Sequence, residues 1–258
     1  MIAKTAIIDS SARIGQNVSI GEFSVIGANV EIGDNCQISP HVVITGPTKI
    51  GQNNKILQFA SVGSDPQDLK YKGEPTLLEI GDNNVIRECC TINRGTVQGG
   101  NITKIGNNNL LMAYVHVAHD CIIGNGNVMA NNTSFAGHVI IDDNVLFGGF
   151  AAVGQFCHIG SYSFVAGKTA ISKDVPPYVL VSGVHGETAT YGLNVVGLKR
   201  RGFSYTTVRS LRKAYHIVYK EGLTVAEALQ RLQEMAKECK EILLFADFIA
   251  KSEHGIIR

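Results

Sequence analysis

The chain contains no tryptophan, and aromatic residues make up only 7% of its 258 residues. Charged residues are also scarce at 17%, and the formal net charge is +1. This near-neutral balance does not predict bulk binding to nucleic acid or to an acidic membrane surface. The shortage of large rings instead suits a narrow interior that is filled by aliphatic side chains.

Targeting and membrane signals are missing as well. No apolar run approaches the ~20 residues that a membrane-spanning helix needs, and the first residues, MIAKTAIIDSSARIG, hold no apolar signal-peptide core. The six cysteines include no CxxC pair. We therefore interpret them as reduced core residues, and we expect a cytoplasmic protein without integral membrane association.

A six-residue repeat dominates the sequence. Apolar residues recur at every sixth position from Ile2 to Val62, return at Ile80, and run from Ile105 to Ile171. Neither a helical nor a simple strand period produces this spacing, which is typical of a parallel β-helix. Three hexapeptides make one triangular coil, so residues 18 apart should stack at the ~4.8 Å spacing of strands. In the motif I-G-x-N-x-x we expect glycine and asparagine at the bends, because both tolerate left-handed backbone conformations.

Two interruptions break the repeat. Residues 63–79 form a polar segment that we interpret as a loop replacing one coil, because Val62 and Ile80 are 18 residues apart. Residues 93–104 shift the repeat by one, since Ile92 and Ile105 are 13 apart. Loops that leave a solenoid commonly carry binding residues.

The composition changes after VPPY (175–178). Residues 203–220 have helical periodicity, Thr224 with Glu227 forms a capping box for a second helix through about 238, and 241–250 predict a third. We therefore expect a β-helix over residues 1–180 and a segment over 181–258 that ends in an α-helical cap. Such a cap would cover the open end of the solenoid.

One column of the predicted stack carries candidate chemistry. His119, Gly137 and Gln155 each follow a repeat position by two residues, so His119 and Gln155 lie two coils or ~10 Å apart with Gly137 between them. The missing side chain leaves a notch beside the imidazole, with a backbone N–H able to face it. A general base beside a free N–H donor is what acyl transfer needs. Asp120 could orient the ring, although a surface histidine beside a turn glycine is the simpler interpretation of this spacing.

A second column contains Gly149 and Gly167, which also follow repeat positions by two residues on another face. A strip without side chains could receive an acyl chain. Two turn glycines are an equally good explanation of this spacing.

Several strings extend over nearly the whole chain and resemble one family: HVAHDC (116–121), AGHV (136–139), QDLKYKGEPT (67–76), RGTVQGG (94–100), DVPPYV (174–179) and GLKRRGFS (197–204). They look like the cytosolic UDP-N-acetylglucosamine acyltransferases, which catalyse the first step of lipid A synthesis. The resemblance implies a left-handed parallel β-helix, an exception to the right-handed crossover rule. It also implies a homotrimer with sites between subunits. The implied reaction moves a 3-hydroxyacyl group from acyl carrier protein to the 3-position of UDP-N-acetylglucosamine.

The resemblance implies roles for individual residues. His119 would be the general base, Asp120 its partner, and the Gly137 N–H the oxyanion donor. The sugar and phosphate site would be lined by Gln67, Asp68, Lys70 and His138, the substrates positioned by His116 and Gln155, and the nucleotide met by Asn194, Arg200 and Arg201. No metal, cofactor or acyl-enzyme is implied.

The carrier protein also has an expected docking surface. The basic cluster Lys199, Arg200, Arg201, Arg209, Arg212 and Lys213 would bind the acidic acyl carrier protein, and salt would weaken that attraction. The alternative for this cluster is a solvated helix face.

Departures from the family pattern keep other readings open. Asn93 and Gly154 stand where the family commonly has histidine, Val196 stands where an acidic residue is frequent, and the stretch 185–192 is slightly longer than usual. A 3-amino analogue of the sugar, giving an amide, is therefore an alternative acceptor. Acylation of a glucosamine 2-amino group is disfavoured because those enzymes carry an extra N-terminal domain, whereas repeats here begin at Ile2.

Two further classes compete with an acyltransferase. A zinc hydratase of the γ-carbonic anhydrase type would use His116, His119 and His138. A non-catalytic scaffold would be unaffected by His119→Ala.

Overall fold

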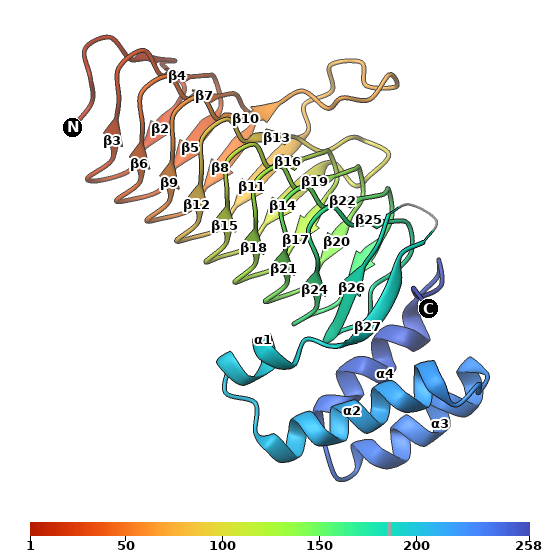
Figure 1. The fold of residues 1–258 in the computed structure, drawn as a ribbon. Coiled ribbons are helices and arrows are strands. Elements are labelled where there is room, and N and C mark those ends of the chain that lie inside the picture. Colours follow the sequence, from red (N-terminus) through yellow and green to blue (C-terminus); the bar gives the residue numbers. More distant parts are fainter. Residues whose placement is uncertain (185–186) are drawn as a thin grey trace.

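The computed structural model describes residues 1–184 and 187–258. It is a long triangular solenoid with helices at its C-terminal end (Figure 1). His185 and Gly186, part of the stretch expected to be longer than usual, lie outside the described residues. From β1 to β25, successive short strands visit three sheets of parallel strands in turn, which we call sheets I, II and III, and the last two strands both join sheet III.

Sheet I consists of β1 (Ile7–Ile8), β4 (Val25–Ile26), β7 (Val43–Ile44), β10 (Ser61–Ser64), β13 (Thr91–Asn93), β16 (His116–Val117), β19 (Ser134–Phe135), β22 (Ala152–Val153) and β25 (Ala170–Ile171). Sheet II consists of β2 (Arg13–Ile14), β5 (Val30–Ile32), β8 (Thr48–Ile50), β11 (Leu77–Ile80), β14 (Ile102–Ile105), β17 (Ile122–Ile123), β20 (Ile140–Ile141) and β23 (His158–Ile159). Sheet III consists of β3 (Ser19–Ile20), β6 (Gln37–Ile38), β9 (Lys55–Ile56), β12 (Val85–Ile86), β15 (Leu110–Leu111), β18 (Val128–Met129), β21 (Leu146–Phe147), β24 (Phe164–Val165), β26 (Val179–Ser182) and β27 (Ala189–Leu193).

The six-residue repeat sets the stacking of the coils. Val117 pairs with Phe135, eighteen residues later, and both side chains are fully buried. Burial of one apolar side chain per hexapeptide fills the narrow interior, and each coil is stabilised by its two neighbours. The predicted left-handed parallel β-helix is confirmed.

The bends between sheets confirm one half of the prediction about turn residues. Asn17 and Asn29 adopt left-handed φ angles of 56° and 57°. The prediction that the motif glycine also adopts a left-handed conformation was wrong, because the glycine after the repeat isoleucine is needed for close stacking instead. Gly33 is not among the residues with positive φ. A Cβ on Gly33 would lie 2.7 Å from the carbonyl carbon of Gly51 in the next coil, so only glycine permits this close stacking.

A ladder of buried asparagines was not predicted. At the corner between sheets II and III, Asn84 donates its backbone N–H to Oδ1 of Asn54 at 2.9 Å, and Asn109 donates to Oδ1 of Asn84 at 2.9 Å. Both amide side chains also donate to backbone carbonyls, those of Gly106 and Gly124. Buried polar groups satisfied in this way align successive coils.

Both interruptions leave the solenoid at the corner between sheets I and II. Ile80 pairs with Ile50, 30 residues earlier, and Ile105 pairs with Ile80, 25 residues earlier. Each coil is therefore complete and carries an insertion, so the predicted replacement of a whole coil was wrong. Figure 1 shows the resulting loops, 65–76 and 94–101, projecting from the same edge of the solenoid.

The last strands lead into the helices. β26 pairs in parallel with β24 and antiparallel with β27. The helices are α1 (Val195–Arg200), α2 (Tyr205–Lys220), α3 (Val225–Ala236) and α4 (Glu241–Lys251), of which α1 was not predicted. The capping box of Thr224 and Glu227 is confirmed at the start of α3. A domain division near residue 180 remains a proposal. Among the described helices, none combines the length and the apolar character needed to cross a membrane.

Candidate active site

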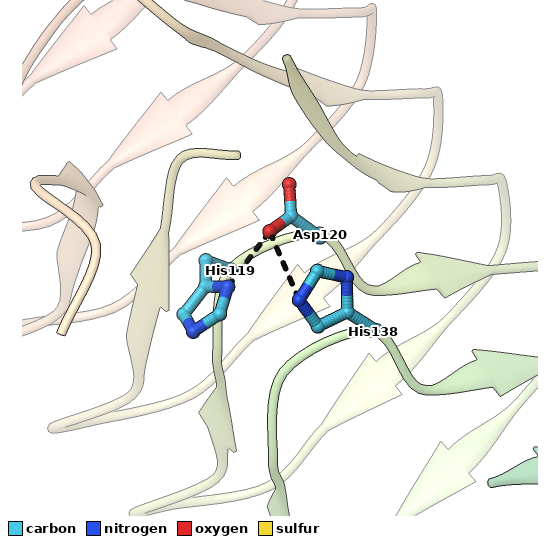
Figure 2. A group of neighbouring side chains, drawn as sticks. All are labelled: His119, Asp120 and His138. Atoms are coloured by element: carbon cyan, nitrogen blue, oxygen red, sulfur yellow. Dashed lines mark hydrogen bonds and ion pairs between the residues drawn. The ribbon is translucent and has the colours of Figure 1, made fainter. Parts of the chain in front are cut away.

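His119 and Asp120 follow β16 at the corner between sheets I and II (Figure 2). Nδ1 of His119 lies 2.7 Å from Oδ2 of Asp120, and the two side chains are 8% and 1% exposed. Because an ionised carboxylate can only accept hydrogen bonds, a neutral imidazole here must carry its proton on Nδ1, which leaves the lone pair on Nε2. A neutral imidazole in this tautomer can act as a general base.

Gly137 lies one coil further along the same column. A Cβ on Gly137 would lie 2.5 Å from Cε1 and 2.8 Å from Nε2 of His119. The imidazole thus fills the notch predicted beside this glycine, and a side chain there would displace the ring. Within residues 1–184 and 187–258, the Gly137 N–H donates to no acceptor. The column therefore places a free N–H donor close to Nε2.

His138 completes the cluster drawn in Figure 2. Its Nε2 lies 3.6 Å from Oδ2 of Asp120, and its ring stacks on Phe156 with centroids 4.6 Å apart. Burial lowers the pKa of His138, while the carboxylates of Asp120 and Asp68 act in the opposite direction.

Loop 65–76 carries the predicted substrate residues Gln67, Asp68 and Lys70. The Asp68 carboxylate accepts the backbone N–H of Lys70 at 2.9 Å, which shapes the turn. The side chains of Gln67 and Lys70 are exposed. The loop borders a polar hollow of about 630 Å³ on sheet I, whose lining includes Gln67 and Thr91.

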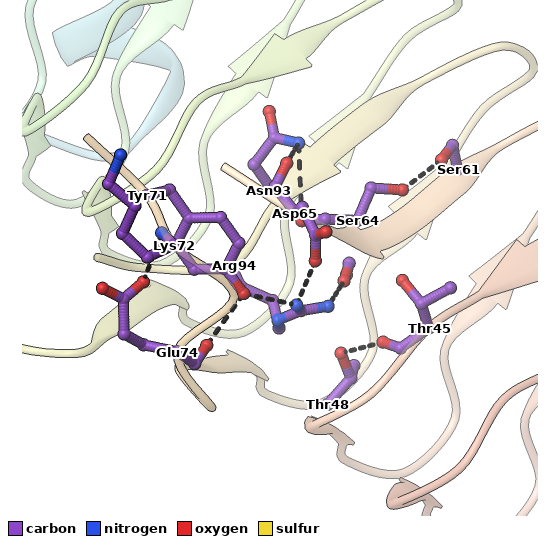
Figure 3. A network of polar contacts seen from close by, with 11 residues as sticks. Thr45, Thr48, Ser61, Ser64, Asp65, Tyr71, Lys72, Glu74, Asn93 and Arg94 are labelled. Atoms are coloured by element: carbon purple, nitrogen blue, oxygen red, sulfur yellow. Dashed lines mark hydrogen bonds and ion pairs between the residues drawn. The ribbon is translucent and has the colours of Figure 1, made fainter. Parts of the chain in front are cut away.

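Asn93, the last residue of β13, and Arg94, which follows it, hold the base of this loop (Figure 3). Nη1 of Arg94 donates to the Gly63 carbonyl at 2.5 Å, and its Nη2 pairs with Asp65. Asn93 is buried and donates its Nδ2 to the Asp65 carbonyl at 2.7 Å. The Nδ2 group of Asn93 is thus committed to the loop, whereas its buried Oδ1 has no hydrogen-bond partner among the described residues. Sequence reasoning missed the role of Arg94 although RGTVQGG had been singled out.

His116 lies in β16, just before His119, whereas Gln155 belongs to the column itself, two coils beyond His119. His116 is half-buried, and its Nδ1 lies 2.7 Å from Oγ1 of Thr91. Burial, with a smaller effect of His119, lowers the pKa of His116. Gln155 is exposed in the turn that follows β22.

Gly149 and Gly167 stack on adjacent coils at the corner between sheets III and I. A Cβ on Gly167 would lie 3.1 Å from the Gly149 carbonyl oxygen. The outward residues of sheet I between this corner and the next are small: Ser134, Ala152 and Ala170. A track with little side-chain bulk therefore connects the glycines to the His119 corner.

The predicted nucleotide residues lie at the third corner, between sheets II and III. Asn194 donates its Nδ2 to the Tyr162 carbonyl at 3.0 Å and caps α1. Arg201 donates to Oδ1 of Asn144 at 2.5 Å, and Arg200 adjoins it at the end of α1. One chain by itself does not bring these residues to His119.

A metal site and a cysteine nucleophile are the remaining chemical alternatives for this region. Among the described residues, the group able to hold a metal is His119, Asp120 and His138, and His116 is not part of it. Burial raises the pKa of Cys121 to about 12 and that of Cys157 to about 11. These two thiols lie inside the solenoid and are poor nucleophiles.

The basic cluster borders a groove between α1 and α2. The groove has a volume of about 410 Å³, and Lys199, Arg209, Arg212 and Lys213 contribute to its walls. Val195, Tyr205 and Val208 supply apolar surface beside these charges. The groove thus combines positive charge with an apolar floor.

Comparisons with known proteins agree over the whole chain. The family model described as UDP N-acetylglucosamine O-acyltransferase, domain 2, matches residues 174–257, and the bacterial transferase hexapeptide model matches residues 11–46 and 102–137. A relative from Stutzerimonas stutzeri (strain A1501), an acyl-[acyl-carrier-protein]–UDP-N-acetylglucosamine O-acyltransferase, is 52% identical over 100% of this chain and 99% of its own. A relative of the same name from Thiobacillus denitrificans is 49% identical over 100% of this chain and 99% of its own length. The solved structure of LpxA from Acinetobacter baumannii superposes with a TM-score of 0.97 at 50% identity and covers 100% of this chain and 99% of that one.

Proposed function

Because the chain belongs to the UDP-N-acetylglucosamine O-acyltransferase family, we propose that it transfers a 3-hydroxyacyl group from acyl carrier protein to the 3-hydroxyl of UDP-N-acetylglucosamine, the first step of lipid A synthesis. One observation carries the assignment of the site. An imidazole with a free Nε2, oriented by a buried carboxylate, lies against a glycine whose N–H has no acceptor among the described residues.

The chemistry follows from this pair of groups. Nε2 of His119 removes the proton of the sugar 3-hydroxyl as its oxygen attacks the thioester carbonyl of the donor. The Gly137 N–H donates to the oxygen on which negative charge develops. When the tetrahedral intermediate collapses, the C–S bond breaks and the imidazolium returns the proton to the sulfur of the carrier. The products are an ester and the free thiol, and the enzyme needs no covalent intermediate.

Acceptor and donor have separate binding surfaces in this proposal. Gln67, Asp68, Lys70 and His138 would bind the sugar and its phosphate, His116 and Gln155 would position the reacting groups, and the track to Gly149 and Gly167 would hold the acyl chain. The groove beside α1 and α2 would dock the acidic carrier protein through its basic residues.

The division of the site between two corners supports a homotrimer. His119 lies at the corner between sheets I and II, whereas Asn194 and Arg201 contact the corner between sheets II and III. Three triangular solenoids packed around a threefold axis would bring one chain's second corner to its neighbour's first. We propose that the nucleotide is bound in this way between subunits. A cytoplasmic location is also a proposal, supported by six free thiols.

Product mass spectrometry tests the function. The purified protein is incubated with 3-hydroxyacyl carrier proteins of several chain lengths and with UDP-N-acetylglucosamine or its 3-amino analogue. We expect an ester product from UDP-N-acetylglucosamine. A product from the amine alone would retain the mechanism but replace the acceptor, and absence of any product would refute the proposal.

A further inference from the structure

The segment RGTVQGG (94–100) takes no part in the proposed proton transfer, yet it closes over the carboxylate of Asp120. Thr96 is 1% exposed. Its backbone N–H donates to Oδ1 of Asp120 at 2.7 Å, and its hydroxyl donates to Oδ2 at 2.6 Å. One residue of loop 94–101 thus holds both oxygens of the carboxylate that orients His119.

The loop is shaped for this contact. The Gly99 N–H donates to Oγ1 of Thr96 at 3.1 Å, which leaves the hydroxyl proton directed at Asp120. A Cβ on Gly99 would lie 2.0 Å from Cγ of Asp120, so only glycine lets the loop pass this close. On the other side, Oγ1 of Thr103 accepts the Asp120 backbone N–H at 2.8 Å. Asp120 is thereby fixed by both its backbone and its side chain.

Fixing the carboxylate matters because two imidazoles lie near the same oxygen. Oδ2 of Asp120 is 2.7 Å from Nδ1 of His119, and Nε2 of His138 is also close, at 3.6 Å from the same oxygen. The Thr96 hydroxyl holds Oδ2 at hydrogen-bond distance from His119, whereas the distance to His138 is longer than a hydrogen bond. With its side chain 1% exposed, Asp120 also has little water to replace a lost donor, and a buried charge without partners is costly.

We propose that Thr96 is a positioning residue, which directs Asp120 toward His119 and away from His138 and so keeps Nε2 of His119 in place for the substrate hydroxyl. This inference rests on the proposed role of His119 as the base. It gives loop 94–101 a function distinct from that of loop 65–76: the first orients the catalytic pair, while the second carries substrate contacts.

Steady-state kinetics of Thr96→Val tests the proposal, because valine keeps the shape and loses the hydroxyl donor. We expect kcat to fall about 10- to 100-fold, less than the ~10²–10⁴-fold contribution of a general base. KM for UDP-N-acetylglucosamine should stay within about twofold. Thr96→Ser, which keeps the hydroxyl, should restore kcat. Thr133→Val is the matched control, because Thr133 is also buried but donates its hydroxyl to the Ala130 carbonyl, and its kcat should be unchanged.

A double mutant shows whether Thr96 acts through Asp120. In an Asp120→Gly background, which suits the φ of 62° at this position, Thr96→Val should cause no further loss. The inference would be overturned if Thr96→Val kept the wild-type kcat, or if Thr96→Val lowered kcat by the same factor in the wild-type and the Asp120→Gly backgrounds. If Thr96→Val does not fold, Gly99→Ala displaces the same carboxylate and should lower kcat in its place, and a normal kcat there would count against the proposal. If His119→Ala is inactive while Thr96→Val has a normal kcat, this inference alone is rejected. If His119→Ala is fully active, the assignment of His119 as the base is rejected.

Discussion

Nη2 of Arg94 lies 3.0 Å from the hydroxyl of Tyr71, a contact that joins the start of loop 94–101 to the middle of loop 65–76. The Tyr71 hydroxyl in turn donates to the Glu74 carbonyl at 2.8 Å. Figure 3 shows these contacts as one network around the guanidinium. The two insertions at this corner are therefore mechanically connected, and the conformation of the substrate loop depends on a residue outside it.

Removal of the Arg94 charge should weaken acceptor binding. Arg94→Met leaves the Gly63 carbonyl, Asp65 and Tyr71 without their common donor, so loop 65–76 should become mobile. We expect KM for UDP-N-acetylglucosamine to rise about tenfold, with a smaller fall in kcat, because mainly ground-state binding is lost. Arg87→Met is the control, since Arg87 pairs with Glu88 at the surface. An unchanged KM in Arg94→Met would show that the loop holds its conformation by itself.

Loss of the imidazole should abolish most of the activity. His119→Ala is expected to lower turnover ~10²–10⁴-fold, the usual contribution of a general base. Binding of UDP-N-acetylglucosamine, measured by calorimetry, should change little, because the loop residues remain. Wild-type turnover in this variant would contradict the assigned base and favour the scaffold alternative.

Mixing two inactive proteins should restore activity if the site lies between subunits. His119→Ala and Arg201→Ala each damage a different corner of the triangular section. Joint unfolding and refolding would give mixed trimers in which some sites combine an intact His119 with an intact Arg201 from a neighbour. We expect turnover well above that of either parent. Refolded mixtures as inactive as the parents would place the complete site within one chain.

A side chain in the glycine track should shorten the preferred acyl group. Gly167→Met places its side chain on the path between the two corners, so long acyl chains should react more slowly relative to short ones. The Cβ would lie 3.1 Å from the Gly149 carbonyl oxygen, which adds a small stacking strain. Gly27→Met is the control. Its Cβ would meet a carbonyl oxygen, that of Ile44, at a similar distance of 3.3 Å, but in a coil remote from His119. An unchanged length profile in Gly167→Met would mean that the acyl chain lies elsewhere.

Charge reversal in the groove beside α1 and α2 should affect the donor alone. In the double variant Arg209→Glu and Arg212→Glu, KM for acyl carrier protein should rise at least about tenfold at low salt, while KM for UDP-N-acetylglucosamine stays constant. Added salt should weaken the binding of acyl carrier protein to the wild type, because salt screens exposed charges. The difference in KM between the wild type and the double variant should therefore become smaller. Lys55→Glu, on an exposed position of β9 in the N-terminal half, should behave like the wild type. If Lys55→Glu raised KM for acyl carrier protein as much as the double variant does, the response would be a nonspecific one to net charge.

The sequence by itself determined the solenoid, the stacking of His119 on Gly137 and the capped helix α3. These features depend on local spacing: one inward side chain in six, a glycine eighteen residues after a histidine, and Glu227 three residues after Thr224. Such patterns repeat along the chain, so they can be recognised without knowledge of distant contacts.

Tertiary structure alone decided how the insertions fold back and which corner each residue occupies. Thr96 reaches Asp120, and Arg94 reaches Asp65, because both loops leave the same corner and return over it. The same holds for Arg201, which a helix after the solenoid carries to a different corner from His119. A loop's return path depends on the balance of backbone entropy against its particular contacts, and no repeat position encodes that balance.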